Sequence, residues 1–421
     1  MAITRIKADT ALSGTIPATN ISSASLANVS TGTSWQAVKT TSFTAVAGEG
    51  YFVNTTSGAI TVTLPGTATV GDTIVLKDYN GTWATNNVTI SSTLKISGAD
   101  ADGTLSTNNT TTTIVYMDTT KGWTPIQNST QGALALDPTY ISATGGTVTE
   151  SGDYKIHTFT GDGCFVVSSL GSGIPCAQAS TVDYLVVAGG GAARDGGAGA
   201  GGFRESKDSG ISSPHTASPL ANTTGLTITA TTYPVSIGAG GADSPTDSAR
   251  NGTPSSFSTI TSAGGGYGRT SPPGSSGGPG GSGGAGRGGS GGTGNTPPVS
   301  PPQGNNGGTS SGPDSGAGGG GGATTVGGNW PGPRVGGTGA TTSISGSAVG
   351  YSGGGAGAAP EAGTNIPREP SGSGGEGISG GQPAPGTQCG VANTGGGGGG
   401  VWNGTNGAGG SGIVIIRYKF Q

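Results

Sequence analysis

Apolar and polar positions alternate along residues 34–130. Ile60, Val62 and Leu64 would share one face of a strand and Thr61 and Thr63 the other, because successive side chains of a strand point to opposite faces. Turn signals separate such runs at regular spacing. The pattern predicts a small all-β module over residues 34–130. Residues 1–33 are polar and rich in Ala, Ser and Thr, and we expect an N-terminal arm there.

The strand pattern continues through residues 131–186, which we interpret as a β-strand lead-in. From about residue 187, glycine tracts alternate with short β-like segments, and the chain ends in the apolar run SGIVIIRYKFQ. A linker would separate two domains, whereas these tracts are bounded by strands throughout. We therefore predict a glycine-rich domain over residues 187–421, closed by a C-terminal strand. The expected fold class is mostly β, with almost no α-helix.

Glycine occupies every third position of GGPGGSGGAGRGGSGGTG, residues 277–294. An extended helix with three residues per turn has no internal hydrogen bonds, and glycine at every third position leaves one of its faces without side chains. Backbones of neighbouring tracts can then approach closely and satisfy each other's peptide groups. The repeat predicts an array of packed polyglycine-type threefold helices.

In such an array, some positions of 277–294 must lie against neighbouring tracts and others must not. We expect Gly283 and Gly286 to contact other tracts, with Ser282, Ala285 and Arg287 between or outside them. Arg287 should point to solvent or an edge, because a buried unpaired charge costs several kcal/mol.

Collagen, charge-driven disorder and a flexible linker are the other interpretations of the glycine tracts. Collagen needs a long Gly-X-Y register and abundant proline, whereas this register ends by Asn295 and contains only Pro279. Disorder driven by charge does not apply, because only 9% of residues are charged and the net charge is −4. A flexible linker stays open as the alternative to the packed array.

The chain offers little catalytic chemistry. Its two histidines are His157, which lies in the alternating run KIHTFT and is expected to be a strand residue, and His215. Matches to G-x-G-x-x-G do not open a helix, so no dinucleotide site is expected. Asp100-Ala-Asp102-Gly lacks the later ligands of a calcium loop and is expected to form a turn. We predict no enzyme, and no catalytic, metal or cofactor site.

The cysteines, the apolar runs and the charge of the chain limit where the protein is expected to be found and what it is expected to bind. Cys164 and Cys176 could meet across a strand and its loop, and otherwise these two and Cys389 would be small buried thiols. No apolar run is long enough to span a bilayer, and the N-terminus lacks the apolar core of a signal peptide. The sequence pI of about 5.1 and the lack of a basic run argue against nucleic acid as a partner. We expect synthesis in a cytoplasm and release by a route other than ordinary secretion.

Several segments together carry a family resemblance. VDYLVVAGGGAARDGGAGAGGFRES, TYPVSIGAGG, SFSTITSAGGGYG and NTGGGGGGVWNGTNGAGGSGIVIIRY resemble the glycine-rich domain of bacteriophage tail fibre and tail adhesin proteins, over about residues 182–420. Upstream, SWQAVKTTSFTAVAGEGYFVNTTSGAITVTLP through DTTKGWTPI is similar to a β-module of virion proteins from marine and cyanobacterial phages. MAITRIKADTALSGTIPATNIS is similar to the N-terminal arm of such fibres.

The resemblance implies a phage virion protein, either a tail fibre or a tail-tip adhesin. Its N-terminal side would attach to other tail or virion proteins, and its glycine-rich part would face outward to bind a host receptor, either a surface polysaccharide or an outer-membrane protein. Related fibres are commonly trimers, which implies a homotrimer through residues 1–130. The alternatives are a purely structural virion component, such as a connector or decoration protein, and an extracellular filament subunit.

Large aromatic and arginine side chains dominate binding hot spots. On a platform with few side chains, such residues are the expected loop-tip contacts. Trp330 and Trp402 have an alternative role as packing wedges that close the ends of glycine helices, since aromatic side chains bury well beside small neighbours. The candidate receptor-binding residues are Tyr267, Arg269, Trp330, Arg334, Tyr351 and Trp402.

Overall fold

The computed structural model divides the chain into two compact units, Met1–Asp137 and Pro138–Gln421. The described residues contain no α-helix, so the predicted mostly-β fold is confirmed. Within this part of the chain, no helix is long and apolar enough to cross a membrane. The structure describes residues 32–126, 135–136, 139–171, 180–211, 213–242, 244, 250–269, 275–312, 316–358, 360, 365–379, 387–402 and 405–421.

The first unit is built from two five-stranded sheets. Up to β6 the chain alternates between them, and each pass adds a parallel strand to its predecessor in the same sheet. One sheet contains, in order, β1 (Ser34–Trp35), β3 (Glu49–Val53), β5 (Thr73–Asp78), β8 (Thr111–Tyr116) and β9 (Trp123–Ile126). The other contains β10 (Ala135–Leu136), β7 (Gly103–Leu105), β6 (Val88–Ser91), β4 (Ile60–Thr63) and β2 (Phe43–Thr44).

The core of the first unit confirms the alternation expected from the sequence. Ile60, Val62 and Leu64 are buried, whereas Thr61 is half-buried and Thr63 is exposed. Burying a side chain of this size contributes about 1.5–3 kcal/mol, and the inward-facing side chains of both sheets form one apolar cluster.

In the second unit a five-stranded sheet and a six-stranded sheet share a core. One contains β11 (Ser142–Thr144), β14 (Gly163–Ser169), β18 (Thr232–Ser236), β19 (Ser255–Phe257) and β20 (Ile260–Ser262). The other contains β12 (Thr147–Ser151), β13 (Tyr154–Phe159), β23 (Ile413–Lys419), β15 (Thr181–Val187) and β16 (Phe203–Glu205), with β17 (Leu226–Thr227) paired to β15. The C-terminal strand β23 pairs with both β13 and β15 and so joins the two halves of this sheet.

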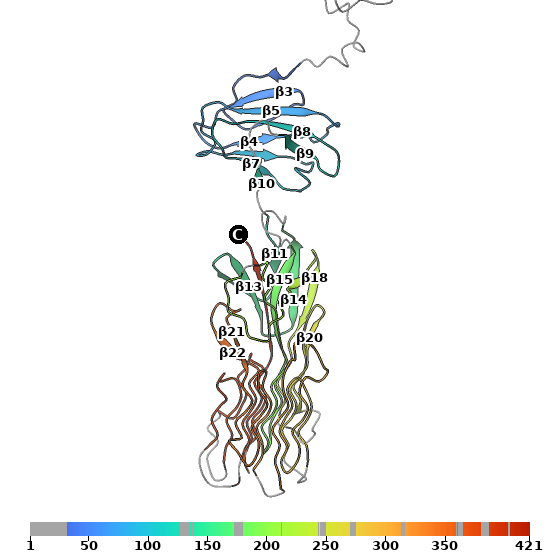
Figure 1. Cartoon of the computed structure of the whole chain (residues 1–421), viewed down its shortest axis with the longest axis vertical. Helices are drawn as coiled ribbons and strands as arrows, with labels where there is room; N and C mark the ends of the chain where they lie inside the picture. Colours follow the sequence, from blue (N-terminus) through green and yellow to red (C-terminus); the bar gives the residue numbers. More distant parts are fainter. Residues whose placement is uncertain are drawn as a thin grey trace, which may run out of the picture. The chain divides into compact units, whose positions relative to one another are not determined.

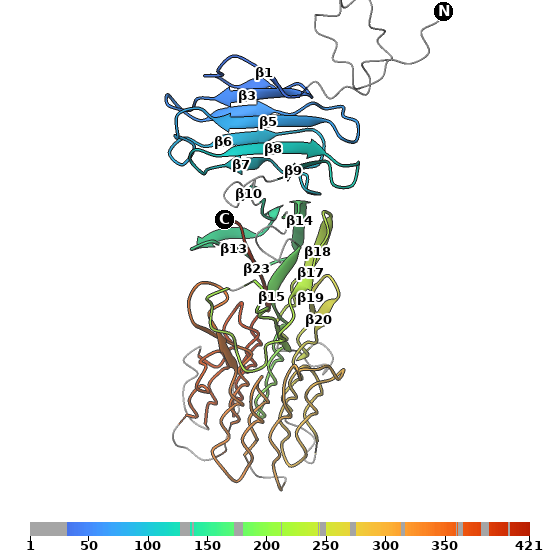
Figure 2. The ribbon, with the colours of Figure 1, turned by 45° about the horizontal axis from the view of Figure 1, so that its top comes forward.

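The glycine tracts run side by side from these strands towards the opposite end of the unit (Figures 1 and 2). Along residues 197–202 every third N–H group donates to the same neighbouring tract. This period of three is that of an extended threefold helix. Residues 197 and 200 donate to 318 and 321, residues 198 and 201 to 398 and 395, and residues 199 and 202 to 266 and 263.

The carbonyl groups of the same tract accept from three further neighbours. The donors are residues 282 and 285, residues 188 and 191, and residue 355. Tract 197–202 therefore has six hydrogen-bonded neighbours and lies inside an array. The packed array predicted from the glycine repeat is confirmed, and the linker interpretation is wrong.

Glycine is required in the tracts because neighbouring backbones leave no room for a side chain. A Cβ added to Gly199 would lie 2.1 Å from the carbonyl oxygen of Ser282, and one added to Gly355 would lie 1.8 Å from that of Gly398. Real Cβ contacts essentially never fall below 3.0 Å, so either change would force two tracts apart.

Residues 277–294 differ from the expected single threefold helix. Gly284 N–H donates to Gly278 O at 2.9 Å, and Gly292 N–H donates to Gly284 O at 2.8 Å. A straight threefold helix rises about 3.1 Å per residue, which would separate residues six apart by roughly 19 Å. The segment therefore folds back on itself in successive passes, and these passes satisfy one another's peptide groups.

The individual positions of this segment confirm one expectation and correct another. Gly283 and Gly286 do contact other backbone, since an added Cβ would lie 1.9 Å from Gly292 O and 2.6 Å from Ser290 O respectively. Ser282 and Ala285, expected between or outside the tracts, are instead fully buried. Both have small side chains, which the array accommodates.

Candidate functional site

The ends of the glycine tracts opposite the strands are brought together by backbone hydrogen bonds. Asp195 follows the end of β15 by eight residues, which at about 3.1 Å per residue places its turn roughly 25 Å from the sheet. Ala358 N–H donates to Asp195 O at 2.8 Å, and Gly357 N–H donates to Arg334 O at 2.9 Å. We call these ends the far turns, defined as residues 194–196, 267–269, 287–290, 330–334 and 401–402.

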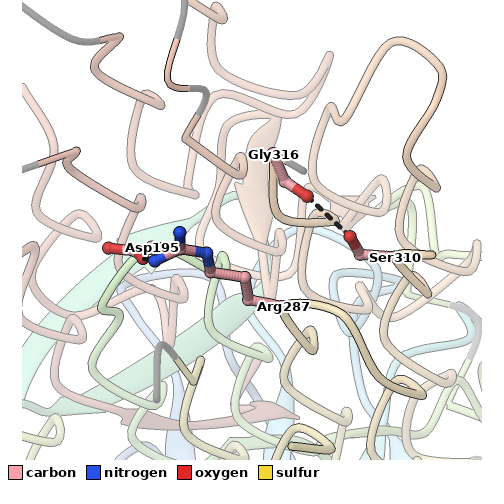
Figure 3. Close-up of polar contacts among 4 residues, drawn as sticks. All are labelled: Asp195, Arg287, Ser310 and Gly316. Atoms are coloured by element: carbon pink, nitrogen blue, oxygen red, sulfur yellow. Dashed lines mark hydrogen bonds and ion pairs between the residues drawn. The ribbon is translucent and has the colours of Figure 1, made fainter. Parts of the chain in front are cut away.

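An ion pair and a stacked aromatic ring link three of the far turns. Arg287 Nη1 lies 2.6 Å from Asp195 Oδ2, and the two side chains point towards each other (Figure 3). Arg287 Cζ lies 4.2 Å from the centre of the Trp402 ring. The two charged side chains are only 19% and 12% exposed, so solvent screens this pair less than it would a surface pair.

Arg287 was expected to point to solvent or an edge. It does lie in a turn at the end of the array, but its side chain is only 19% exposed. Its charge lies partly buried because Asp195 neutralises it and Trp402 covers one face of the guanidinium group. The premise that an unpaired charge cannot be buried still holds. The side chain simply has a partner.

A second arginine–aromatic pair occupies the turn WPGPR. Arg334 Cζ lies 4.7 Å from the centre of the Trp330 ring. Trp330 N–H donates to Thr309 O at 2.9 Å, and in the neighbouring tract Ser310 Oγ donates to Gly316 O at 2.6 Å (Figure 3). Hydrogen bonds of the array therefore hold the turn that carries this pair.

A third pair lies at the end of the tract that contains Tyr267. Arg269 Cζ is 5.9 Å from the centre of the Tyr267 ring, and Arg269 Nη1 donates to the Tyr267 hydroxyl at 3.3 Å. Stacking of a guanidinium group on an aromatic ring contributes roughly 0.5–1 kcal/mol at exposed sites. The three pairs hold flat, half-exposed surfaces in fixed orientations.

Five of the six candidate residues thus come together in the far turns, and their role as receptor contacts stays a prediction. Tyr351 is different. It lies in β22 (Val349–Tyr351), which pairs with β21 (Ala340–Thr342), and it is only 2% exposed among apolar residues that include Ile344 and Leu185. A ring covered in this way is unavailable to a partner, so Tyr351 is wrong as a surface contact.

Sequence reasoning missed Asp195 as a member of this site and Arg287 as its partner. The two residues are 92 positions apart, and no motif or periodicity connects them. Their proximity depends on the order of the tracts in the array, and local sequence patterns do not reveal this order.

The remaining chemistry-bearing residues lie elsewhere. His157 is a strand residue of β13, as predicted, and it is buried. Its Nε2 lies 3.0 Å from the Tyr418 hydroxyl and its Nδ1 lies 2.7 Å from Gly145 O. Burial lowers the pKa of His157. Cys164 is exposed and Cys389 is half-buried, so the expectation of a buried thiol is wrong for Cys164. Cys176 lies outside the described residues, and its pairing with Cys164 stays a prediction.

Comparison with known protein families gives one match, to a family described as a glycine-rich domain, over residues 167–419. The matched range covers the second unit from β14 to the end of β23. No curated protein matches the chain.

Proposed function

Because the chain belongs to the glycine-rich domain family, we propose that it is a binding protein whose tract array presents the far turns to a partner. The setting we propose is a bacteriophage tail, where the chain would act as a tail fibre or tail-tip adhesin that contacts a host-surface polysaccharide or outer-membrane protein. The segment resemblances to tail fibre proteins support this setting. No catalytic activity forms part of the proposal.

One observation carries the proposal: separate far turns place three arginine–aromatic pairs at the same end of one hydrogen-bonded array. Binding loses affinity when flexible loops must be ordered, and tracts with up to six neighbours hold their turns in place before a partner arrives. Aromatic and arginine side chains are the residue types that contribute most to hot spots. The far turns therefore combine suitable chemistry with preorganisation.

Adhesion to host cells tests the proposal. The purified protein is expected to bind host cells and to compete with the phage, and Trp330→Ala or Trp402→Ala is expected to weaken binding by about tenfold or more, as truncation of a hot-spot aromatic does. Tyr79→Ala is the control, since Tyr79 is a 54% exposed aromatic residue of the first unit outside the edge strands β1 and β2, and its loss should leave binding unchanged.

The alternative role for Trp330 and Trp402 as packing wedges predicts a different result. In that case, either substitution would lower the unfolding temperature of the second unit, and the loss of adhesion would follow from the loss of folding. Binding that is equal for all three variants, with intact folding, would contradict the proposed function.

We also propose that the first unit assembles as a homotrimer through residues 1–130. The short strands β1 and β2 each lie at the edge of a sheet, and exposed edges are commonly managed by association. Trp35 and Val46, which are 46% and 54% exposed, lie in or next to these strands. Mass measurement in solution is expected to give about 120 kDa, three times the 39.9 kDa of one chain, whereas a mass of one chain would contradict the trimer.

A further inference from the structure

One face of the six-stranded sheet is covered by a strap, which we define as residues 213–222 together with the hairpin β21–β22. The two parts are joined by Thr216 N–H, which donates to Ser343 Oγ at 2.7 Å, and by Ser343 N–H, which donates to Thr216 O at 2.9 Å. Ile344 and Leu220 of the strap pack against the apolar part of this face.

Four titratable side chains are buried beneath or within the strap, at exposures of 0–4%: Asp183, Glu205, His215 and Arg417. Asp183 on β15 and Arg417 on β23 are cross-strand partners, and Arg417 Nη1 donates to Ile344 O of the strap at 3.2 Å. Arg417 Cζ also lies 4.9 Å from the centre of the neutral Tyr154 ring. The strap therefore closes over a row of buried titratable side chains.

Asp183 is held in an environment that disfavours its charge. Its Oδ1 accepts from Asp208 N–H at 2.8 Å and Ser206 Oγ at 3.3 Å, whereas its buried Oδ2 has no hydrogen-bond partner. Burial, with the negative charges of Asp208 and Glu205 nearby, raises the pKa of Asp183 to about 7 despite these two hydrogen bonds. Arg417 supplies the opposing positive charge from β23.

The environment of His215 also disfavours the charged form of the side chain, which for histidine is the protonated imidazole. Its Nδ1 lies 2.8 Å from Ser213 Oγ, whereas its buried Nε2 has no hydrogen-bond partner. Burial, together with the positive charges of Arg417 and Lys207, lowers the pKa of His215 to about 4. Both buried groups are thus neutral in mildly acidic solution.

We propose that Asp183 and His215 form a compensating pair that keeps the strap closed over a wide pH range. When the strap opens, Asp183 regains an ordinary acidity, so raising the pH from about 4 to 7 favours the open state through this group. His215 also regains its ordinary basicity, so lowering the pH from about 6.5 to 4 favours the open state through the imidazole. A change in pH that favours the open strap through Asp183 therefore favours the closed strap through His215, and the reverse.

Glu205 affects the pH dependence of the strap in the same direction as Asp183. It accepts from Ser218 N–H at 2.9 Å and from Thr342 Oγ1 at 2.5 Å, both in the strap. Burial raises the pKa of Glu205. Glu205 is present in the wild type and in both variants, so the difference between each variant and the wild type reports the replaced group together with its electrostatic coupling to Glu205.

Hydrogen exchange of the strap amides at pH 5 and pH 7.5, corrected for intrinsic rates, tests the proposal. Asp183→Asn keeps an oxygen for the two hydrogen bonds but cannot ionise, and His215→Asn can keep the contact with Ser213 without a titrating ring. Relative to the wild type, protection in Asp183→Asn should fall at least about tenfold on going from pH 7.5 to pH 5, since one pKa unit corresponds to a factor of ten. In His215→Asn it should rise by at least about tenfold over the same change.

Protection of tract 197–202, measured in the same samples, reports whether each variant is folded. If a variant fails to fold, the imidazole titration of His215 in the wild type decides: the proposal expects a neutral ring down to about pH 4–5, and titration near pH 6.5 would overturn it. Protection ratios that do not change with pH in folded variants would also overturn it.

Discussion

Gly283→Val is expected to destabilise the second unit by at least about 3 kcal/mol. Its Cβ would lie 1.9 Å from Gly292 O, and the two tracts would have to separate. Gly283 N–H donates to Asn305 O at 3.0 Å, and Gly283 O accepts from Gly321 N–H at 2.8 Å, so the displacement would strain both bonds. Overpacking alone typically costs about 1–3 kcal/mol, and each lost hydrogen bond adds about 1 kcal/mol.

Chemical denaturation measures this effect, with Gly161→Val as the matched control. A Cβ at Gly161 meets no atom within 4 Å, so this change should stay within about 0.5 kcal/mol of the wild type. Ser282 is unsuitable as a control because it is fully buried. Equal, small effects at 283 and 161 would mean that the tracts do not pack as described.

Glu369→Ala is expected to destabilise the second unit by at least about 3 kcal/mol, because each buried donor left without an acceptor costs about 1–3 kcal/mol. The Glu369 carboxylate is 1% exposed. Its oxygens accept from the N–H groups of Gly339, Ser371, Ser373 and Gly374 at 2.6–3.3 Å. Alanine would leave these backbone donors buried without an acceptor, and hydrogen bonds to a charged group are roughly twice as strong as neutral ones.

Thermal unfolding with Glu150→Ala as the control separates this effect from a general change in charge. Glu150 is exposed on β12 and lies 4.0 Å from Lys155, and an exposed ion pair of this kind contributes little. A loss of stability at Glu369 no larger than at Glu150 would show that the carboxylate does not organise this turn.

Local patterns predicted the elements of the fold well. The alternation of Ile60, Val62 and Leu64 with threonine predicted a half-buried strand because strand periodicity acts over neighbouring residues. The glycine repeat predicted close packing of backbones because the lack of a side chain has the same consequence in any array.

Features that depend on distant residues were not predictable in the same way. The reversals within 277–294 arise from contacts between its own successive passes, and a regular repeat contains no sign of where such reversals occur. Arg287 could be partly buried because Asp195, far away in sequence, neutralises it. Tyr351 stands next to a glycine tract in the sequence, and the pairing of β21 with β22 places it in the core.

The candidate site was also predictable only in part: its residue types stood out in the sequence, whereas their arrangement did not. Composition singled out six large side chains because aromatic and arginine residues are rare in this chain, and the structure gathers five of them in the far turns. Their arrangement as three stacked pairs follows from the order of the tracts in the array.

The most direct test of the proposed function is to locate this chain in the phage particle by electron cryo-microscopy, with a label attached at the turn 330–334. Our account predicts that the label lies at the free end of a tail appendage, where the far turns would meet the host surface. A label on the capsid, or one buried where the appendage joins the tail, would contradict it.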